Sequence, residues 1–289
     1  MKKIAILGCE NSHADAFLKF IKTTEEFSDI DVIGVYSDDI AAAEKLNTKF
    51  DVPILNDFSD AVGKIDGLII TARHGNNHYK YAKPYISSGI PMFIDKPITI
   101  SEDEALDFIR ELKSNNVSIS GGSSLKQDSY VQQLKHDSSN DIDGKTIGGF
   151  VRAPYQSENA YGGFYFYAQH LVEMICEIFG RFPISVTAKK NGDQITVIFH
   201  YEAYDCIGLF SDKNYIYYAS RMSLNGTKSF DIPITSNWYY NEFKEFYGLL
   251  CGEHQNSTYE EFISPVFIMN AIERSILSGT EEPIHKFEI

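Results

Sequence analysis

The chain has 289 residues, enough for two domains, and its 43% hydrophobic and 23% charged residues are typical of a globular protein. A formal net charge of −14 argues against nucleic acid as a partner, because phosphate binding needs a basic surface. The four cysteines lack CxxC spacing and no apolar run approaches a membrane span, so we expect a cytoplasmic protein with no metal site, disulfide scaffold or membrane partner.

Strands and helices alternate through the first 121 residues. Short apolar runs that end at glycine or a polar residue predict buried strands, and apolar residues three and four apart predict helices between them. The expected strands are 3–8, 31–36, 65–71, 91–95 and 117–120, and the expected helices are 13–23, 40–50, 76–88 and 101–115. This rhythm is typical of a doubly wound parallel sheet of the Rossmann class, which we assign to residues 1–121.

The pattern changes after residue 121. We expect helices at 125–136, 170–179, 242–251 and 263–277, a loop at 137–143, and strands at 149–153, 183–190, 195–200, 205–211, 214–220 and 228–232. Strands separated by turn residues predict an α+β domain with an open, mostly antiparallel sheet over residues 122–289. Because the exposed face of such a sheet needs a cover, we expect a homodimer or homotetramer formed through it.

The turn after the first strand is a candidate nucleotide site. In doubly wound sheets the backbone N–H groups of this turn hold a pyrophosphate. The candidate cofactor contacts here are Gly8, Glu10, Asn11, Ser12 and His13. Only Gly8 remains of the usual three glycines, and a plain strand-to-helix turn explains the local sequence equally well.

Two further strand ends carry candidate cofactor contacts. Ser37 and Asp38 end the second strand, where a carboxylate normally binds the adenosine ribose. The aspartates at 38 and 39 disfavour a 2′-phosphate, so NAD is favoured over NADP, although helix capping explains Asp39 equally well. The residues after the third strand line a nucleotide or cap a helix; they are Ala72, Arg73, His74, Asn77 and His78.

The tripeptide Asp95-Lys96-Pro97 ends the fourth buried strand. A lysine at this edge points into the crevice where open α/β sheets bind ligands. A desolvated lysine can serve as an acid, a base or a carbonyl polariser, although a lysine before a proline is common on protein surfaces.

In order and spacing, these segments resemble the Gfo/Idh/MocA family, the group of glucose-fructose oxidoreductase and inositol dehydrogenase. The resemblance covers nearly the whole chain and is carried by residues 3–13, 65–78, 90–97, 144–148 and 161–170. It implies a Rossmann domain, an α/β domain with an open sheet, and NAD(P)-dependent redox chemistry on sugars, polyols or related carbonyl compounds. It also implies Lys96 and His170 as the catalytic and substrate-binding pair.

Aromatic residues near His170 are candidate substrate contacts. Tyr155 and Tyr167 are our candidates for direct contact. Tyr161, Tyr165 and Trp238 are candidate walls for a sugar ring, although core or interface packing is the commoner place for such residues.

The chain departs from the family at several positions. Asp95 replaces the family's glutamate, Phe166 replaces its aspartate four residues before the histidine, and Ala168 replaces a glycine. The missing aspartate removes one member of the usual Lys–Asp–His relay. Two alternatives to an oxidoreductase therefore stay open: a dinucleotide- or sugar-binding sensor or partner protein without turnover, and redox-assisted glycoside cleavage.

Overall fold

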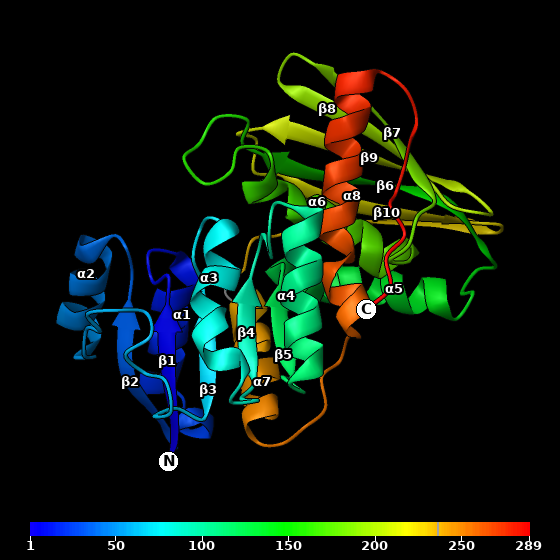
Figure 1. Cartoon of the computed structure of the whole chain (residues 1–289). Helices are drawn as coiled ribbons and strands as arrows, with labels where there is room; N and C mark the ends of the chain where they lie inside the picture. The colour runs from blue at the N-terminus through cyan, green and yellow to red at the C-terminus, as the bar shows by residue number, and fades with distance from the viewer. Residues whose placement is uncertain (236) are drawn as a thin grey trace.

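Two β-sheets organise the computed structural model, which describes residues 1–235 and 237–289 (Figure 1). Five parallel strands form the first sheet in the order β2-β1-β3-β4-β5. These are β1 (Lys2–Leu7), β2 (Ile30–Tyr36), β3 (Gly67–Ile70), β4 (Met92–Asp95) and β5 (Ile119–Gly122). A parallel bridge between Val35 and Ile54 adds a short outer edge beside β2. With this edge the order corresponds to the Rossmann arrangement, and the predicted doubly wound sheet is confirmed.

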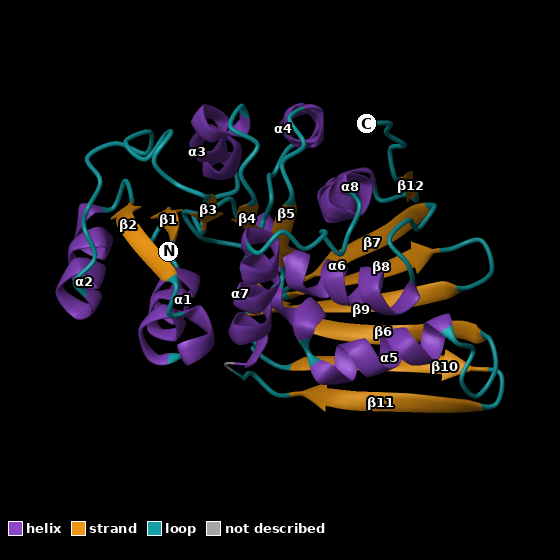
Figure 2. Cartoon of the chain, turned by 90° about the horizontal axis from the view of Figure 1, so that it is seen from below, coloured by secondary structure: helices purple, strands orange, loops and turns teal. Residues whose placement is uncertain are grey.

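Helices cover both faces of this sheet. The connecting helices are α1 (Ser12–Thr23), α2 (Ile40–Phe50), α3 (Asn76–Ile86) and α4 (Glu102–Ser114), with a 3₁₀ turn at Glu25–Phe27. Figure 2 shows α3 and α4 on one face and α1 with α7 (Asn237–Leu250) on the other. Because both faces are covered, every residue of β3, β4 and β5 is buried, which explains the apolar runs 68–70 and 92–94 in β3 and β4.

Seven strands form the second sheet in the order β11-β10-β6-β9-β8-β7-β12. They are β6 (Thr146–Tyr155), β7 (Ser185–Asn191), β8 (Gln194–His200), β9 (Asp205–Asp212), β10 (Tyr217–Ser223), β11 (Gly226–Ile232) and β12 (Glu282–Pro283). The pair β6–β9 is parallel and the other pairs are antiparallel, so the predicted mostly antiparallel sheet is confirmed. Three helices lie on one face, namely α5 (Ser129–Ser139), α6 (Tyr165–Phe179) and α8 (Tyr259–Ser278) (Figure 2).

The four helices predicted after residue 121 start at other residues in the structure. Among them, α7 begins at Asn237 rather than at 242, and α8 begins at Tyr259 rather than at 263. The single helix expected over 125–136 is wrong, because Ser124–Gln127 is a 3₁₀ turn and the Asp128 side chain caps a separate α5 through Tyr130 N at 2.8 Å. The helix expected from His170 begins one turn earlier at Tyr165, so His170 lies inside α6.

The C-terminal segment contributes to both domains. Phe243 and Phe246 of α7 belong to the same apolar cluster as Phe17 and Phe93 of the Rossmann domain. The division predicted after residue 121 falls one residue before the end of β5, and we keep it as a proposal for the two domains. The short β12 was not predicted, because its two residues carry no strand pattern of their own.

Candidate functional site

The turn between β1 and α1 keeps one obligatory glycine. Gly8 has a φ of 72°, and a Cβ there would lie 2.4 Å from the backbone of Ala72. Only glycine fits this close approach to the loop after β3. Asn11 caps α1 by accepting a hydrogen bond from Ser12 N at 2.7 Å, and its Nδ2 donates to Asp95 Oδ2 at 2.7 Å. The turn is thereby tied to the end of β4.

Glu10 occupies the second glycine position of the usual fingerprint. Its Oε2 accepts a hydrogen bond from Ser37 Oγ at 2.7 Å, and its Oε1 accepts one from the backbone N–H of Arg73 at 3.0 Å. One carboxylate therefore joins the carboxyl ends of β1, β2 and β3.

Asp38 follows Ser37 and is held by two tyrosines. Its Oδ1 accepts a hydrogen bond from Tyr36 at 2.6 Å, and its Oδ2 accepts one from Tyr81 at 2.8 Å. The hydrogen bond from Tyr36 is the main cause that keeps the pKa of Asp38 below its ordinary value. The side chain is therefore a carboxylate at neutral pH.

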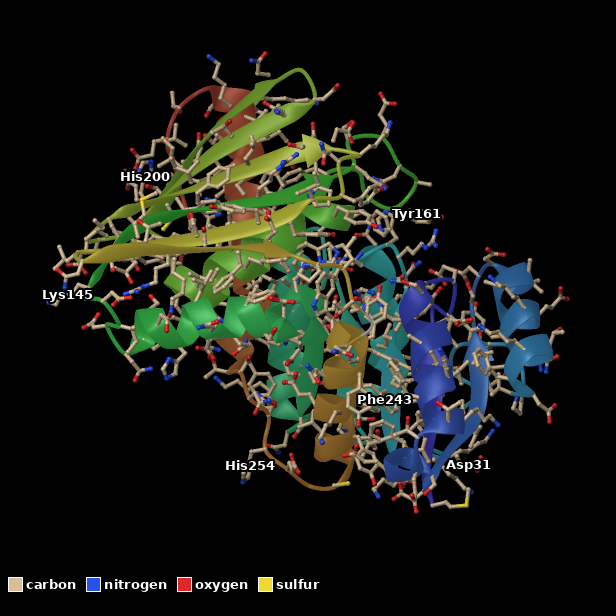
Figure 3. The ribbon with its side chains drawn as sticks, turned by 180° about the vertical axis from the view of Figure 1, so that it is seen from behind. Asp31, Lys145, Tyr161, His200, Phe243 and His254 are labelled. Atoms are coloured by element: carbon tan, nitrogen blue, oxygen red, sulfur yellow. The ribbon has the colours of Figure 1, made fainter. Side chains whose placement is uncertain are left out.

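The residues after β3 have two different surroundings. His78 is fully buried, with Nε2 2.8 Å from Ala72 O and Nδ1 3.2 Å from Ile98 O, so it holds two loops together and lines no open space. Arg73 instead donates from Nη1 to Tyr161 Oη at 3.0 Å. Figure 3 shows Tyr161 in a loop of the C-terminal domain that reaches toward the first sheet. Arg73 therefore bridges the two domains.

Two cavities flank Glu10. One of about 650 Å³ runs between α1 and α2, and one of about 470 Å³ lies at the ends of β2 and β3. Together they are lined by eight of the predicted cofactor contacts, namely Glu10, Asn11, Ser12, Ser37, Asp38, Arg73, His74 and Asn77. The other predicted contacts lie outside the lining of these two cavities; they are Gly8, His13, Ala72, His78, Asp95 and Lys96.

Lys96 is buried at the end of β4, with 5% of its surface exposed. Its Nζ donates to the carbonyl oxygen of Phe166 at 3.2 Å and lies 4.3 Å from the centroid of the Phe166 ring. The ring of Tyr167 is 5.0 Å away. Burial lowers the pKa of Lys96 despite the opposing charge of Asp95.

His170 lies beside Tyr167, and their ring centroids are 5.4 Å apart. Its Nδ1 is 2.7 Å from Ser123 Oγ, which orients the imidazole. Burial first, and the charge of Lys96 second, hold the pKa of His170 well below its ordinary value. The imidazole is therefore neutral at physiological pH and can accept a proton. The structure thus brings Lys96, Tyr167 and His170 together.

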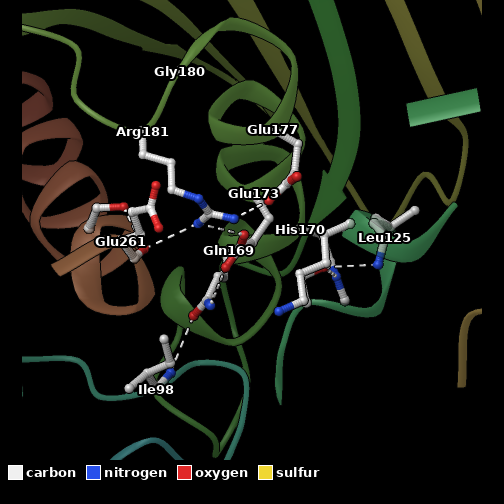
Figure 4. A network of polar contacts seen from close by, with 12 residues as sticks. Ile98, Leu125, Gln169, His170, Glu173, Glu177, Gly180, Arg181 and Glu261 are labelled. Carbon is white, nitrogen blue, oxygen red and sulfur yellow. Dashed lines mark hydrogen bonds and ion pairs between the residues drawn. The ribbon is translucent and has the colours of Figure 1, made fainter. Parts of the chain in front are cut away.

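A polar network behind His170 fixes α6 against the loop after Lys96 (Figure 4). Gln169 accepts a hydrogen bond from Ile98 N at 3.2 Å and donates one to Glu173 Oε1 at 3.2 Å. Arg181 pairs with Glu173 at 3.3 Å and also with Glu177. The hydrogen bond between Ile98 and Gln169 links the two domains, and the ion pairs of Arg181 hold α6 to the segment that follows it.

The sequence predicted that His13 contacts the cofactor, but the structure buries its side chain between two carboxyl groups. It is 2% exposed, with Nδ1 3.0 Å from Asp95 Oδ2 and Nε2 3.2 Å from Glu242 Oε2. Burial opposes the charged imidazole, but Asp95 and Glu242 together raise the pKa of His13 well above its ordinary value. Burial raises the pKa of Glu242 to about 7. His13 therefore joins α1, β4 and α7 from inside, as a buried ionic link.

The predicted aromatic contacts have mixed positions. Tyr155 is 1% exposed and packs against Phe164 and Phe210, so the structure does not bring it to the surface of the crevice. Tyr165 donates to Glu273 at 2.8 Å, and Trp238 donates to Asp128 at 2.7 Å. Both belong to the core of the C-terminal domain. Tyr161, beside Arg73, is the predicted wall that remains at the domain junction.

Three site residues were not predicted from the sequence, namely Ser123, Tyr239 and Glu242. The ring of Tyr239 packs against that of His13 at a centroid distance of 4.3 Å, and Tyr239 lines the larger cavity. Glu242 had a readable signal, because it is a charged residue on the helix face that carries Phe243 and Phe246. Ser123 had none, since a serine after a short strand is ordinary.

The sequence model described as an oxidoreductase family with an NAD-binding Rossmann fold matches residues 2–123. A comparison with curated protein sequences finds no significant match.

Solved structures of the same shape are numerous. A myo-inositol dehydrogenase from Corynebacterium glutamicum is 14% identical, with a TM-score of 0.84 over 99% of this chain and 100% of that chain. GenD2 from gentamicin A biosynthesis, solved with NAD, is 13% identical, with a TM-score of 0.86 over 99% of this chain and 97% of that chain. A scyllo-inositol dehydrogenase from Lactobacillus casei, solved with NAD(H) and scyllo-inositol, is 14% identical, with a TM-score of 0.84 over 98% and 99%. At these identities the likeness establishes the fold.

Proposed function

We propose that the chain is a member of the Gfo/Idh/MocA family and that it transfers a hydride between a nicotinamide dinucleotide and a sugar, polyol or related carbonyl compound. The match of residues 2–123 to the model of an oxidoreductase family with an NAD-binding Rossmann fold supports this proposal. The observation that carries the proposal is the convergence of Lys96, Tyr167 and His170 beyond the carboxyl end of β4. Open α/β sheets bind their ligands at this edge.

Lys96 and His170 divide the chemistry in this proposal. When bound, the nicotinamide takes the hydride from the carbon that bears the hydroxyl group. His170 receives the hydroxyl proton on Nε2, because Ser123 holds its Nδ1 and burial keeps the imidazole neutral. Lys96 orients the same oxygen through Nζ and stabilises the negative charge that develops on it. Phe166 and Tyr167 cover the lysine and exclude water.

The residues fit a dinucleotide at the ends of β1, β2 and β3. Gly8 provides the close turn, α1 begins at that turn, and two cavities flank it. The residues that hold the cofactor in this proposal are the predicted contacts that line the two cavities. NAD is favoured over NADP because the acidic side chains of Glu10 and Asp38 line the smaller cavity.

A carbohydrate-like substrate is supported by two observations. The similar solved structures include proteins named as inositol dehydrogenases, one of them with scyllo-inositol. In this chain Tyr167 lies 5.7 Å from Tyr215 and 5.0 Å from Phe166 between ring centroids, so the junction offers aromatic faces and hydroxyl groups to a polyol.

The test begins with parallel fluorescence titrations of NADH and NADPH into the folded protein, followed by turnover with a panel of sugars, inositols and their ketones. We expect binding of NADH and reduction of NAD by at least one polyol. Lys96→Ala should keep NADH affinity within a few-fold and abolish turnover. Unchanged turnover in Lys96→Ala would remove Lys96 from the mechanism, and no binding of either nucleotide would remove the proposed function.

A second function is favoured by Phe166. The ring and the carbonyl oxygen of Phe166 lie beside Lys96 Nζ, at the position where the family has a carboxylate. The chain would then be a dinucleotide- or sugar-binding sensor or partner protein without turnover. Tight NADH binding together with no turnover on the whole panel would select this alternative.

We also propose an assembly and a location. Ile147, Ile207 and Met222 lie on adjacent strands β6, β9 and β10 and are 51%, 42% and 42% exposed, which supports a homodimer or homotetramer through this sheet. All four cysteines are free thiols, which supports a cytoplasmic location. In the part of the chain that the structure describes, no helix combines the length and apolar character needed to cross a membrane.

A further inference from the structure

The end of β2 lacks the carboxylate that binds the adenosine ribose in most Rossmann domains. Ser37 holds that position, and it is 5% exposed. Its Oγ donates a 2.7 Å hydrogen bond to Glu10 Oε2. The serine hydroxyl therefore orients a carboxylate that comes from a different strand end.

Asp38, the next residue, is already held by other groups. Each of its oxygens accepts a hydrogen bond from a tyrosine, Tyr36 at 2.6 Å and Tyr81 at 2.8 Å. Lys80 Nζ lies a further 3.7 Å from Oδ2. A ribose at Asp38 would have to share the carboxylate with these two hydroxyl groups and with the ammonium group of Lys80.

Glu10 brings a carboxylate to the same place by another route. It starts from the turn after β1, reaches Ser37 at the end of β2 and accepts from Arg73 N at the end of β3. It is the one residue that lines both of the cavities beside the turn. Each carboxylate oxygen has one donor so far and can accept a second.

We propose that Glu10 replaces the missing carboxylate, binds the 2′- and 3′-hydroxyl groups of the adenosine ribose and selects NAD over NADP. The inference rests on the proposed function and gives its cofactor site a specificity residue. A ribose diol donates two hydrogen bonds to a carboxylate, whereas a 2′-phosphate places like charge against it. The glutamate at this fingerprint glycine position then supplies a carboxylate at the place where Ser37 provides only a hydroxyl group.

The experiment measures equilibrium binding of NADH, NADPH and ADP-ribose to the full chain and to two variants, Glu10→Gln and Asp15→Asn. Glu10→Gln keeps the size of the side chain and removes its charge. Asp15→Asn is the matched control, because Asp15 lines the same larger cavity but pairs with Lys49 on the outer side of α1 and α2. Circular dichroism of each variant checks the fold.

We expect Glu10→Gln to weaken NADH and ADP-ribose by about 10- to 100-fold, the range for hydrogen bonds to a charged group, and to weaken NADPH less or strengthen it. Asp15→Asn should leave the NADH-to-NADPH ratio unchanged. Unchanged or tighter NADH binding in Glu10→Gln would overturn the inference, since the carboxylate would then be neutral or obstructive. If the unaltered chain binds none of the three ligands, the proposed function itself fails and this inference fails with it.

Discussion

Phe166 gives Lys96 an electrostatic setting that a carboxylate would reverse. The ammonium group lies 4.3 Å from the centre of the aromatic ring and within 3.2 Å of the Phe166 carbonyl oxygen. An aromatic face attracts a cation weakly and holds no charge, so burial dominates and the pKa of Lys96 falls. At the scale of one residue, Lys96 is a desolvated amine beside an aromatic ring, with no carboxylate at position 166.

Restoring the carboxylate with Phe166→Asp should therefore raise the pKa of Lys96. If protonated Lys96 stabilises the substrate oxygen, activity is lost as pH rises through that pKa, so the alkaline limb of the pH–rate profile should move to higher pH by about one unit or more. Phe166→Asn is the control of equal size without charge. The same alkaline limb in both variants would contradict the assignment; if no turnover is measurable, titration of Lys96 by NMR gives the same comparison.

The ionic link of His13, Asp95 and Glu242 joins three elements whose residues are far apart in sequence. The helix α1 supplies the imidazole, β4 one carboxylate and α7 the other. Tyr239 covers the ring, and Lys126 adds a positive charge that favours ionised Glu242. Because all three groups are buried, protons that bind here are coupled to folding.

The link predicts a loss of stability between pH about 5 and 8. In the folded chain the pKa of Glu242 is about 7, above its ordinary value, so the protonated carboxyl group stabilises the folded state in acid. This stabilisation is lost as the pH rises toward 7. The raised pKa of His13 acts in the same direction at higher pH. In urea unfolding across this range, the free energy of unfolding of the unaltered chain should fall relative to that of Glu242→Gln by roughly 1–3 kcal/mol. The lowered pKa values of His78 and His170 act in the opposite direction, but they do so in both proteins and cancel in this comparison.

The matched control for that measurement is Glu245→Gln, one turn along α7, whose carboxylate accepts hydrogen bonds from Gln127 and Asn256 nearer the surface. It should keep the slope of the unaltered chain. Equal slopes in the Glu242 and Glu245 variants would show that the buried link does not bind protons on folding.

The sequence predicts the helices and strands better than it predicts the side-chain contacts between them. The apolar runs that became β1 to β5 are local signals, and the position of Lys96 follows from the end of one such run. The inward turn of His13 depends on Glu242, and the orientation of Glu10 depends on Ser37 and Arg73, which are distant in the chain. Contacts between residues that are far apart in the chain produce no periodic pattern in the sequence. The fingerprint positions therefore predicted a nucleotide-binding turn but did not predict these contacts.

At the scale of the whole molecule, α7 makes the two domains interdependent. The chain leaves the second sheet, and α7 then completes the aromatic core under the first one, as the label of Phe243 in Figure 3 shows. The ring centroid of Phe243 lies 5.1 Å from that of Phe17 and 4.8 Å from that of Phe27. Without α7, the first domain would expose this apolar face to water.

Phe243→Ala should therefore destabilise the whole chain by about 3–5 kcal/mol, because the buried ring leaves a cavity in a well-packed cluster. Unfolding followed by far-UV circular dichroism and by fluorescence of the single tryptophan, Trp238, should shift together. Phe182→Ala, whose ring is 58% exposed, is the matched control and should change stability by no more than about 0.5 kcal/mol. Two separated transitions in Phe243→Ala would mean that the domains fold independently. A single shared transition would mean that Lys96 and His170 come together only when both domains are folded.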